Sequence, residues 1–221
     1  MATLRHALRH AARSDRGFTA IELLVATAIT VVVLGGAVAI TSQVQNGYRR
    51  QVEDAVAMQE GRFALEWIGR IIRGAGNDPF NVDDAVSCGA VEYIPVRWDP
   101  DGDEAYNSIR IQSDSNPPDG QIGGTGCDQA AEDVTISFDP DTNIIEFLDN
   151  SLGGEVATRT DNVIENLEFV YRNSDHAIAV AEADIVYVEV IVTVRTRTLD
   201  VAAGTPVTRT LRQDIRIRSL G

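Results

Sequence analysis

Few side chains after residue 17 could catalyse a reaction or bind a transition metal. His176 is the only histidine in that part of the chain, and Cys88 and Cys127 are the only cysteines. A structural zinc site needs about four nitrogen or sulfur ligands, and a nucleophilic triad needs a histidine beside its Ser or Cys. We therefore interpret His176 as an exposed loop residue beside Asp175 and expect that the protein is not an enzyme.

One loop segment carries oxygen ligands of the kind that calcium prefers. Its carboxylates are those of Asp99, Asp101, Asp103 and Glu104. The spacing departs from an EF-hand, because Gly102 comes too early and Arg110 stands where the final bidentate Glu belongs. Two interpretations stay open, a Ca²⁺ site formed by these four residues and a solvated acidic turn.

A long apolar segment near the N-terminus determines where the rest of the chain lies relative to a membrane. Residues 23–40 form an uninterrupted uncharged run, and a helix of that length rises roughly 27 Å, nearly the thickness of a bilayer core. Four Arg against one Asp in residues 1–17 precede it. Positive charge before a span favours retention of that side in the cytoplasm. We expect a single membrane pass with the acidic head outside the cytoplasm.

The residues in front of the apolar run differ from a secretory signal. Such a signal places a small-residue cleavage site after its apolar run, and residues 38–40 offer only a weak candidate. Residues 16–26 instead read RGFTAIELLVA. This stretch resembles the type IV prepilin family, in which a leader peptidase cuts on the cytoplasmic side, after the glycine and before the apolar run.

The resemblance implies roles for three residues. Gly17 ends a leader of residues 1–17, Phe18 becomes the N-methylated N-terminus, and Glu22 is the acid used in assembly. It also implies partners: prepilin peptidase, an inner-membrane assembly platform, other pilins and minor pilins. The precursor would cross the inner membrane once with its head in the periplasm. The mature product would enter a pilus filament, at the cell surface, or a pseudopilus.

Physical arguments support Gly17 and Glu22 separately. A glycine lets the backbone enter a confined protease site without a side chain in the way. A carboxylate inside an apolar segment costs at least a few kcal/mol unless it is paired or reaches the headgroups. The amine of Phe18 on a neighbouring subunit is the partner we expect for Glu22. The alternative is a membrane-edge Glu that reaches for lipid headgroups.

Helical periodicity continues beyond the apolar run. Residues 18–42 are expected to form the transmembrane and assembly part of the helix, and residues 43–76 an amphipathic part that covers the head and stops near residues 74–76. The apolar residues that recur at spacings of mostly three and four are Val44, Tyr48, Val52, Val56, Phe63, Trp67, Ile68, Ile71 and Ile72. We expect this stripe to pack on the head.

Residues 77–221 change to a period of two. Alternation in residues 134–138 and 145–147 flanks turn residues 139–143, which predicts a hairpin. Further strands are predicted around residues 163–171, 186–194 and 207–218. One-sided alternation indicates an antiparallel sheet with one wet face. The predicted class is α+β, with a long N-terminal helix packed on an antiparallel β-sheet head. The resemblance to prepilins implies that this is a type IV pilin fold.

The C-terminal half is similar to one branch of that family. Residues 161–172, the Val-rich strand and the Arg-rich last strand resemble the PilW-like minor pilins and the J-type minor pseudopilins of type II secretion. Residues 59–66 and 70–76 fit the same branch. This resemblance implies a structural minor subunit that primes or caps a filament.

Charge and compartment complete the expectations. After residue 74, ten Arg face twenty-seven Asp and Glu. This balance makes nucleic acid an unlikely partner for the head, although a local Arg stripe could still bind it. Two cysteines in an oxidising compartment suggest one Cys88–Cys127 disulfide, worth roughly 4 kcal/mol for a loop of about forty residues.

Two functional alternatives remain open at this stage. One is a minor pseudopilin of a type II secretion system. The other, from a different class, is a single-span membrane-tethered ligand-binding module. A membrane-anchored hydrolase is disfavoured by the scarcity of histidine.

Overall fold

The computed structural model describes residues 17–78, 93–103, 105–115, 131–150, 155–199 and 205–218. The chain divides into two units, residues 1–49 and residues 50–221, which are described separately. Helix α2, Ala20–Gly74, contributes to both units. With antiparallel sheets in the second unit, the class is α+β, as predicted.

Helix α2 ends where the sequence predicts. Ala75 N–H donates to Ile72 O (3.1 Å), and Gly76 takes a left-handed backbone with φ of 68°. A glycine adopts that conformation without steric cost, which suits the end of a helix. Gly76 N–H then donates to Gln112 O (2.9 Å), so the end of α2 is tied to strand β2, Ser108–Gln112.

Within the described residues, the first sheet contains five antiparallel strands in the order β1-β2-β3-β4-β5. The other four strands are β1, Val96–Trp98, β3, Asp133–Asp139, β4, Ile144–Asp149, and β5, Glu155–Thr158. The predicted hairpin is confirmed as β3 and β4, which pair from Val134 with Asp149 to Asp139 with Ile144. Asp139 fixes its turn, because its carboxylate accepts hydrogen bonds from Asp141 N–H (2.8 Å) and Thr142 Oγ1 (2.7 Å).

The second sheet contains the predicted C-terminal strands, in the order β6-β7-β8. They are β6, Ile164–Arg172, β7, Tyr187–Leu199, and β8, Pro206–Arg216, with a short 3₁₀ helix η1, Glu182–Asp184, before β7. The strands that the structure describes therefore form two sheets and not the single sheet that was expected. The division falls at residues 159–163, where Thr160 Oγ1 accepts the N–H of Ile145 (2.8 Å) and the next strand pairs with β7.

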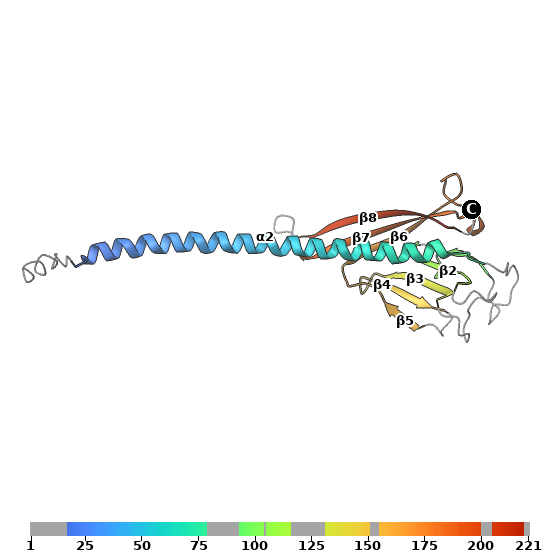
Figure 1. Cartoon of the computed structure of the whole chain (residues 1–221), viewed down its shortest axis with the longest axis horizontal. Coiled ribbons are helices and arrows are strands. Elements are labelled where there is room, and N and C mark those ends of the chain that lie inside the picture. Colours follow the sequence, from blue (N-terminus) through green and yellow to red (C-terminus); the bar gives the residue numbers. More distant parts are fainter. Residues whose placement is uncertain are drawn as a thin grey trace, which may run out of the picture. The chain divides into compact units, whose positions relative to one another are not determined.

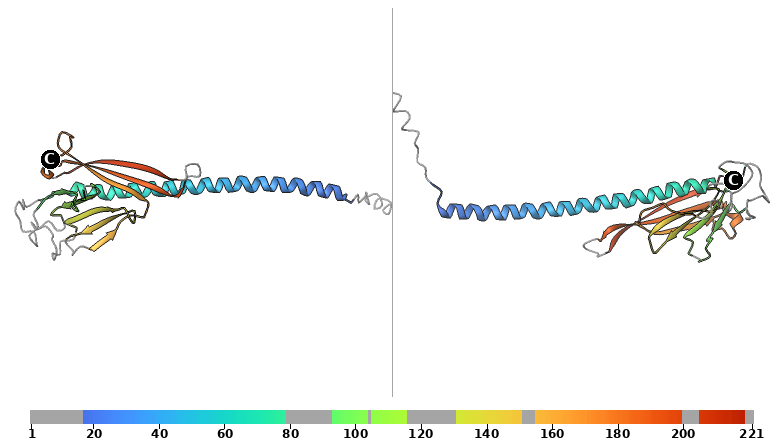
Figure 2. Two further views of the ribbon diagram at one scale, coloured as in Figure 1. Left: turned by 180° about the vertical axis from the view of Figure 1, so that it is seen from behind. Right: turned by 90° about the horizontal axis from the view of Figure 1, so that it is seen from below.

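Both sheets lie along the part of α2 that belongs to the second unit (Figures 1 and 2). Buried residues of α2, of β1 to β4 and of β6 to β8 form one hydrophobic core. The second sheet contacts α2 through Val194, Leu211 and Ile215. The first sheet contacts α2 through Phe147, whose ring lies edge-on to Trp67 with centroids 6.5 Å apart.

The face of α2 that enters this core differs from the predicted stripe. Its buried residues are Ala57, Gly61, Ala64, Leu65, Ile68, Gly69 and Ile72. Ile68 and Ile72 were predicted correctly, and Trp67 and Ile71 pack partly buried against the core. Val52, Val56 and Phe63 are exposed in the second unit, so their predicted packing on the head is wrong. The physical reason is the close approach of the helix to the second sheet, for which Gly61 and Gly69 leave room.

Gly61 marks the closest approach. A Cβ atom at this position would lie 2.6 Å from Leu211 Cδ1 and 2.8 Å from Val194 Cγ1, below any normal contact distance. The backbone of α2 therefore rests directly on side chains of β7 and β8.

We predict that Gly61→Leu lowers the free energy of unfolding of the head by about 3 kcal/mol, because overpacking there outweighs the gain in helix propensity. Chemical denaturation of the full chain in detergent, followed by near-UV circular dichroism, measures this. Gly47→Leu is the control, since a Cβ at Gly47 meets nothing within 4 Å. Equal stability of the two variants would contradict the close contact.

Candidate functional site

The first turn of α2 is organised by a reciprocal pair of residues. Thr19 O accepts the N–H of Leu23 (3.2 Å), so Thr19 is the N-cap of the helix. Thr19 N–H and Thr19 Oγ1 both donate to Glu22 Oε2 at 2.9 Å, and Glu22 N–H donates to Thr19 Oγ1 at 3.3 Å. This arrangement is a capping box. The sequence T-x-x-E at residues 19–22 signals it, although our sequence analysis did not use that signal.

Gly17 and Phe18 lie immediately before this cap. Both are exposed and non-helical, and the Phe18 side chain is 88% exposed. A Cβ at Gly17 would meet nothing within 4 Å. The capping box fixes the start of the helix at Thr19, so the Gly17–Phe18 bond stays in accessible, non-helical backbone. The structure thus keeps Gly17, Phe18 and Glu22 within one short segment.

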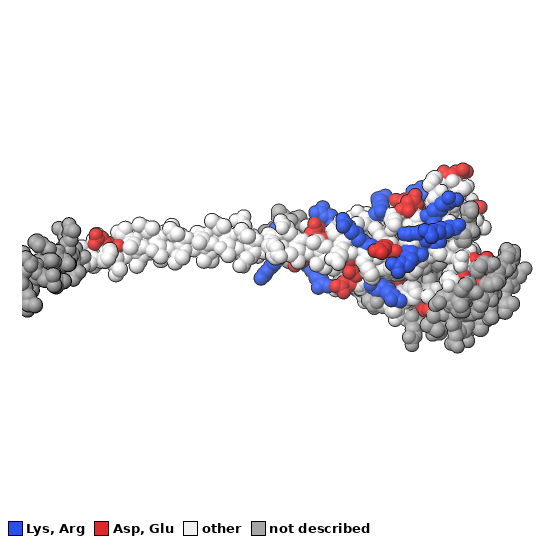
Figure 3. Space-filling view, viewed as in Figure 1, with Lys and Arg blue, Asp and Glu red and all other residues white. Residues whose placement is uncertain are grey.

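The part of α2 after Glu22 has an unusual surface. Glu22 is the only charged residue between Phe18 and Arg49, and Figure 3 shows this part of the helix in white apart from acid near its start. Its large hydrophobic side chains, from Leu23 to Val44, are 50 to 75% exposed. By length and composition α2 can cross a membrane. Such a surface requires lipid or other apolar helices around it.

A shorter apolar stripe lies on α2 within the second unit. Val52, Val56 and Phe63 are 41 to 51% exposed, on a helix whose opposite face is in the core. Their spacing of four and seven residues places them on one side of the helix. This side is available for contact with another apolar surface.

The acidic loop is compact. Carboxylate oxygens of Asp99, Asp101 and Asp103 lie within 4.8 Å of one another, and Glu104 is outside the described residues. Hydrogen bonds of the loop itself engage two of them, from Ser108 Oγ to Asp101 (2.9 Å) and from Ala105 N–H to Asp103 (2.8 Å).

These bonds affect the acidity of the loop. Partial burial favours the neutral form of Asp101, but hydrogen bonds with Asp99, Ser108 and the backbone outweigh it, and the pKa of Asp101 lies below its ordinary value. Arg110 is directed elsewhere, because its Nε donates to Asp133 Oδ1 at 2.7 Å. Hydrogen bonds engage Asp101 and Asp103, as in a solvated acidic turn, and we assign no ligand to the loop.

Three further sequence-derived residues have different outcomes. Cys88 and Cys127 lie outside the described residues, so their disulfide stays a prediction. His176 is exposed, as expected, and its ring stacks on Tyr187 with centroids 4.2 Å apart.

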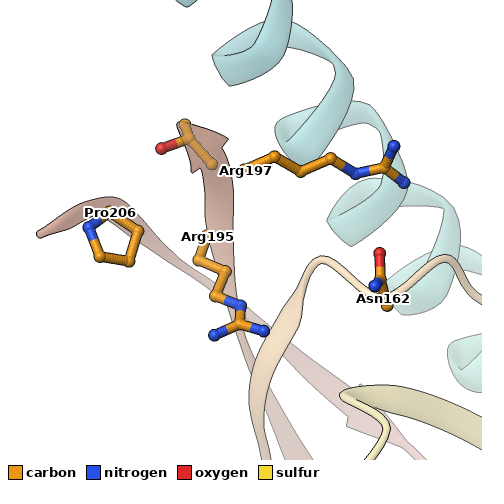
Figure 4. A pocket seen from close by; sticks show the side chains of 5 residues that line it. Asn162, Arg195, Arg197 and Pro206 are labelled. Atoms are coloured by element: carbon orange, nitrogen blue, oxygen red, sulfur yellow. The ribbon is translucent and has the colours of Figure 1, made fainter. Parts of the chain in front are cut away.

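A pocket of about 590 Å³ lies where β7 ends and β8 begins (Figure 4). Arg195 and Arg197 line it together with Asn162, Thr196 and Pro206. The two guanidinium groups point in different directions in Figure 4, and Arg197 lies 3.5 Å from Asp161. They do not converge on one anion, so the pocket is not a built anion site.

Comparison with known proteins adds no family to this picture. No protein-family model, no curated protein and no solved structure matches the chain. The segment around Gly17, Phe18 and Glu22 and the surface of α2 are therefore the features of the chain that point to a function.

Proposed function

We propose that the chain is a type IV prepilin whose mature form is a structural minor subunit of a pilus. The observation that carries the proposal is the arrangement at the N-terminus. An exposed, non-helical Gly17–Phe18 bond directly precedes a capped helix whose apolar residues through Val44 are all exposed. The residue pattern of the prepilin family places its cleavage site at the same point.

Cleavage uses the accessibility of the Gly17–Phe18 bond. A peptidase must bind several residues of backbone in a non-helical form before it can attack the carbonyl between them. The Thr19–Glu22 capping box supports this, because it fixes the start of the helix after the bond and not before it. The cut would create a cationic amine at Phe18, four residues before Glu22.

Assembly then uses α2. Its apolar surface would pack against the corresponding helices of neighbouring subunits, and the Glu22 carboxylate would pair with the Phe18 amine of a neighbour. Val52, Val56 and Phe63 would extend the contact into the second unit. Before assembly the same surface would hold the subunit in the inner membrane, with the head in the periplasm.

The finer assignments belong to the same proposal. The α+β head on a long helix is compatible with a type IV pilin fold, and the C-terminal strands support the PilW-like minor branch through their sequence. A type II secretion pseudopilus uses the same cleavage and helix packing, so the proposal covers a minor pseudopilin as the second form of this function.

Mass spectrometry of the N-terminus tests the proposal. In cells that express the chain together with a prepilin peptidase, we expect a protein that begins at N-methylated Phe18. In cells without the peptidase, the same chain should keep residues 1–17. An N-terminus at Met1 or Ala2 in both strains, or a cut after Ala39, would overturn the proposal and favour a membrane-tethered or secreted module.

A further inference from the structure

A pocket of about 390 Å³ lies in the head where the last turns of α2 meet the end of β8. It is lined by Glu66, Arg70, Arg73 and Gly74 of α2 and by Arg218, which follows β8. Three Arg against one Glu give this basic pocket a net charge of +2. Figure 3 shows blue side chains gathered over α2 and β8 in the head. Because ten Arg face twenty-seven acids after residue 74, the pocket is a positive site on an acidic head.

Arg73 lies in the seam between α2 and β8. A Cβ atom at Gly69, one turn earlier, would lie 3.2 Å from Arg73 Nη2, 3.2 Å from Ile215 Cδ1 and 3.4 Å from Gln213 Oε1. The missing side chain of Gly69 therefore leaves room for the guanidinium group beside β8. Arg73 is partly buried, so it loses less conformational freedom on binding a ligand than a fully exposed Arg does.

The sheet supplies the third Arg of the pocket from a fixed point of the backbone. Ile217 is fully buried, and its N–H donates to Val186 O at 3.0 Å. This contact anchors the backbone next to Arg218, whose side chain is exposed. The cations of the pocket thus come from two elements that tertiary packing brings together.

Two of the three Arg have no anionic partner. Among the residues that the structure describes, neither Arg73 nor Arg218 makes an ion pair. Other Arg of the head do pair with acids, namely Arg110, Arg172, Arg197, Arg209 and Arg212. Arg70 lies 3.5 Å from Glu66, but both side chains are at least 75% exposed, and such a pair contributes little. A better ligand can therefore displace Glu66 from Arg70.

The helix end explains only part of this arrangement. A cation in the last turn of a helix is favoured by the negative end of the helix dipole, and Arg73 occupies the last turn of α2. The same interaction does not account for Arg218, which lies outside the helix, or for the position of both groups at one pocket. An external anion accounts for both.

The size of the pocket favours an acidic protein segment over a nucleic acid. Tight binding of a nucleic acid needs several phosphate contacts along its backbone, and a long polyanion would also meet the acidic surface of the rest of the head. Two or three neighbouring carboxylates need only the three guanidinium groups of the pocket. Each Arg–carboxylate pair can form two parallel hydrogen bonds, which makes the contact specific.

We propose that the basic pocket binds a short acidic segment of a partner protein. Two carboxylates of the partner would pair with Arg73 and Arg218, and a third would replace Glu66 at Arg70. This inference rests on side chains of the head alone and does not depend on the proposed pilus function.

A labelled peptide tests the proposal against the full chain in nonionic detergent micelles. The probe is tetramethylrhodamine-Gly-Asp-Glu-Asp-Gly-amide, and fluorescence anisotropy measures its dissociation constant at about 20 mM salt, where exposed charges are weakly screened. We expect binding at least about tenfold tighter than that of the same peptide with Asn and Gln in place of Asp and Glu. An increase to about 150 mM salt should weaken the acidic peptide about fivefold.

Variants of the chain separate the pocket from the other Arg of the head. Arg73→Gln and Arg218→Gln should each weaken the acidic peptide about fivefold. Glu66→Gln should tighten it about threefold, because this change removes the carboxylate that competes for Arg70. Arg62→Gln is the matched control, since Arg62 is an exposed Arg on α2 that does not line the pocket. It should bind like the wild type.

Near-UV circular dichroism confirms that each variant is folded. Equal binding of the acidic and amide peptides would overturn the proposal. So would wild-type affinity in both folded Arg73→Gln and folded Arg218→Gln, or an equal loss in Arg62→Gln, which would show attraction without a site. Tighter binding of a labelled oligothymidylate of about twelve nucleotides, weakened by the same pocket variants, would also overturn it and assign the pocket to nucleic acid.

Discussion

Replacement of Gly17 by Phe should leave the precursor uncut in cells that contain a prepilin peptidase. Gly17 is the residue before the proposed scissile bond, and its backbone is exposed and non-helical. A peptidase that holds this backbone in a narrow site has no room for a large side chain. Space in the precursor itself is not limiting, because a Cβ at Gly17 meets nothing within 4 Å.

The measurement is the ratio of precursor to mature protein on immunoblots, with intact mass to identify each band. We expect at least a hundredfold loss of processing for Gly17→Phe, about 3 kcal/mol in transition-state stabilisation, and partial processing for Gly17→Ala. Ala12→Phe, which adds the same ring elsewhere in the leader, should be processed normally. Normal maturation of Gly17→Phe would remove the prepilin proposal, whatever the state of the head.

Much of the fold follows from local patterns in the sequence. The end of α2 near Gly76 and the β3–β4 hairpin were predicted because turn and helix-stop residues act over a few positions. The division into two sheets was not predicted, because strand partners are chosen by distant contacts. Alternation in residues 164–172 reveals a strand, but it does not show that β6 pairs with β7.

The wrong stripe on α2 has a similar cause. Val52, Val56 and Phe63 are apolar and correctly spaced for burial, but hydrophobic periodicity does not identify the surface that covers them. The head takes the face with Ala57, Gly61 and Ala64 instead, because small residues permit close contact. The face with Val52, Val56 and Phe63, which periodicity predicted to be buried, is exposed in the single chain.

The candidate sites also differ in whether their residues are close together in the sequence. Gly17, Phe18 and Glu22 lie within six residues, so their relation could be predicted from the sequence. The cluster of Trp98, Phe169 and Tyr171 could not, because its rings meet only through strand pairing and loop contacts. No local spacing connects these three residues.

Three variants can separate the proposed role of Glu22 in filament assembly from its role in the capping box. In the structure the carboxylate caps Thr19, so a loss of assembly in Glu22→Ala has two explanations. Glu22→Gln keeps an acceptor at the same position of a capping box but removes the charge. Thr19→Ala removes the hydroxyl of the cap but keeps the charge of Glu22.

If Glu22 pairs with the Phe18 amine of a neighbour, the charge decides assembly. We expect Glu22→Ala and Glu22→Gln each to reduce incorporation into filaments at least about tenfold, since an apolar helix surface leaves the neighbour's amine without its partner. Thr19→Ala should reduce incorporation by no more than about threefold, the effect of one exposed cap hydrogen bond. All three variants should be cleaved and should reach the membrane, because neither step needs the carboxylate.

Recovery in sheared filaments, or in crosslinked complexes with other minor pilins, is measured against the level of each variant in the membrane. Wild-type incorporation of Glu22→Gln together with strong loss in Thr19→Ala would show that Glu22 serves only the helix cap. Wild-type incorporation of all three variants would leave Glu22 as a residue that reaches the headgroups. In either case assembly would rest on the apolar side chains from Phe18 to Val44, which supply contact area between neighbouring helices. No charged pair would then set the register of one helix against the next.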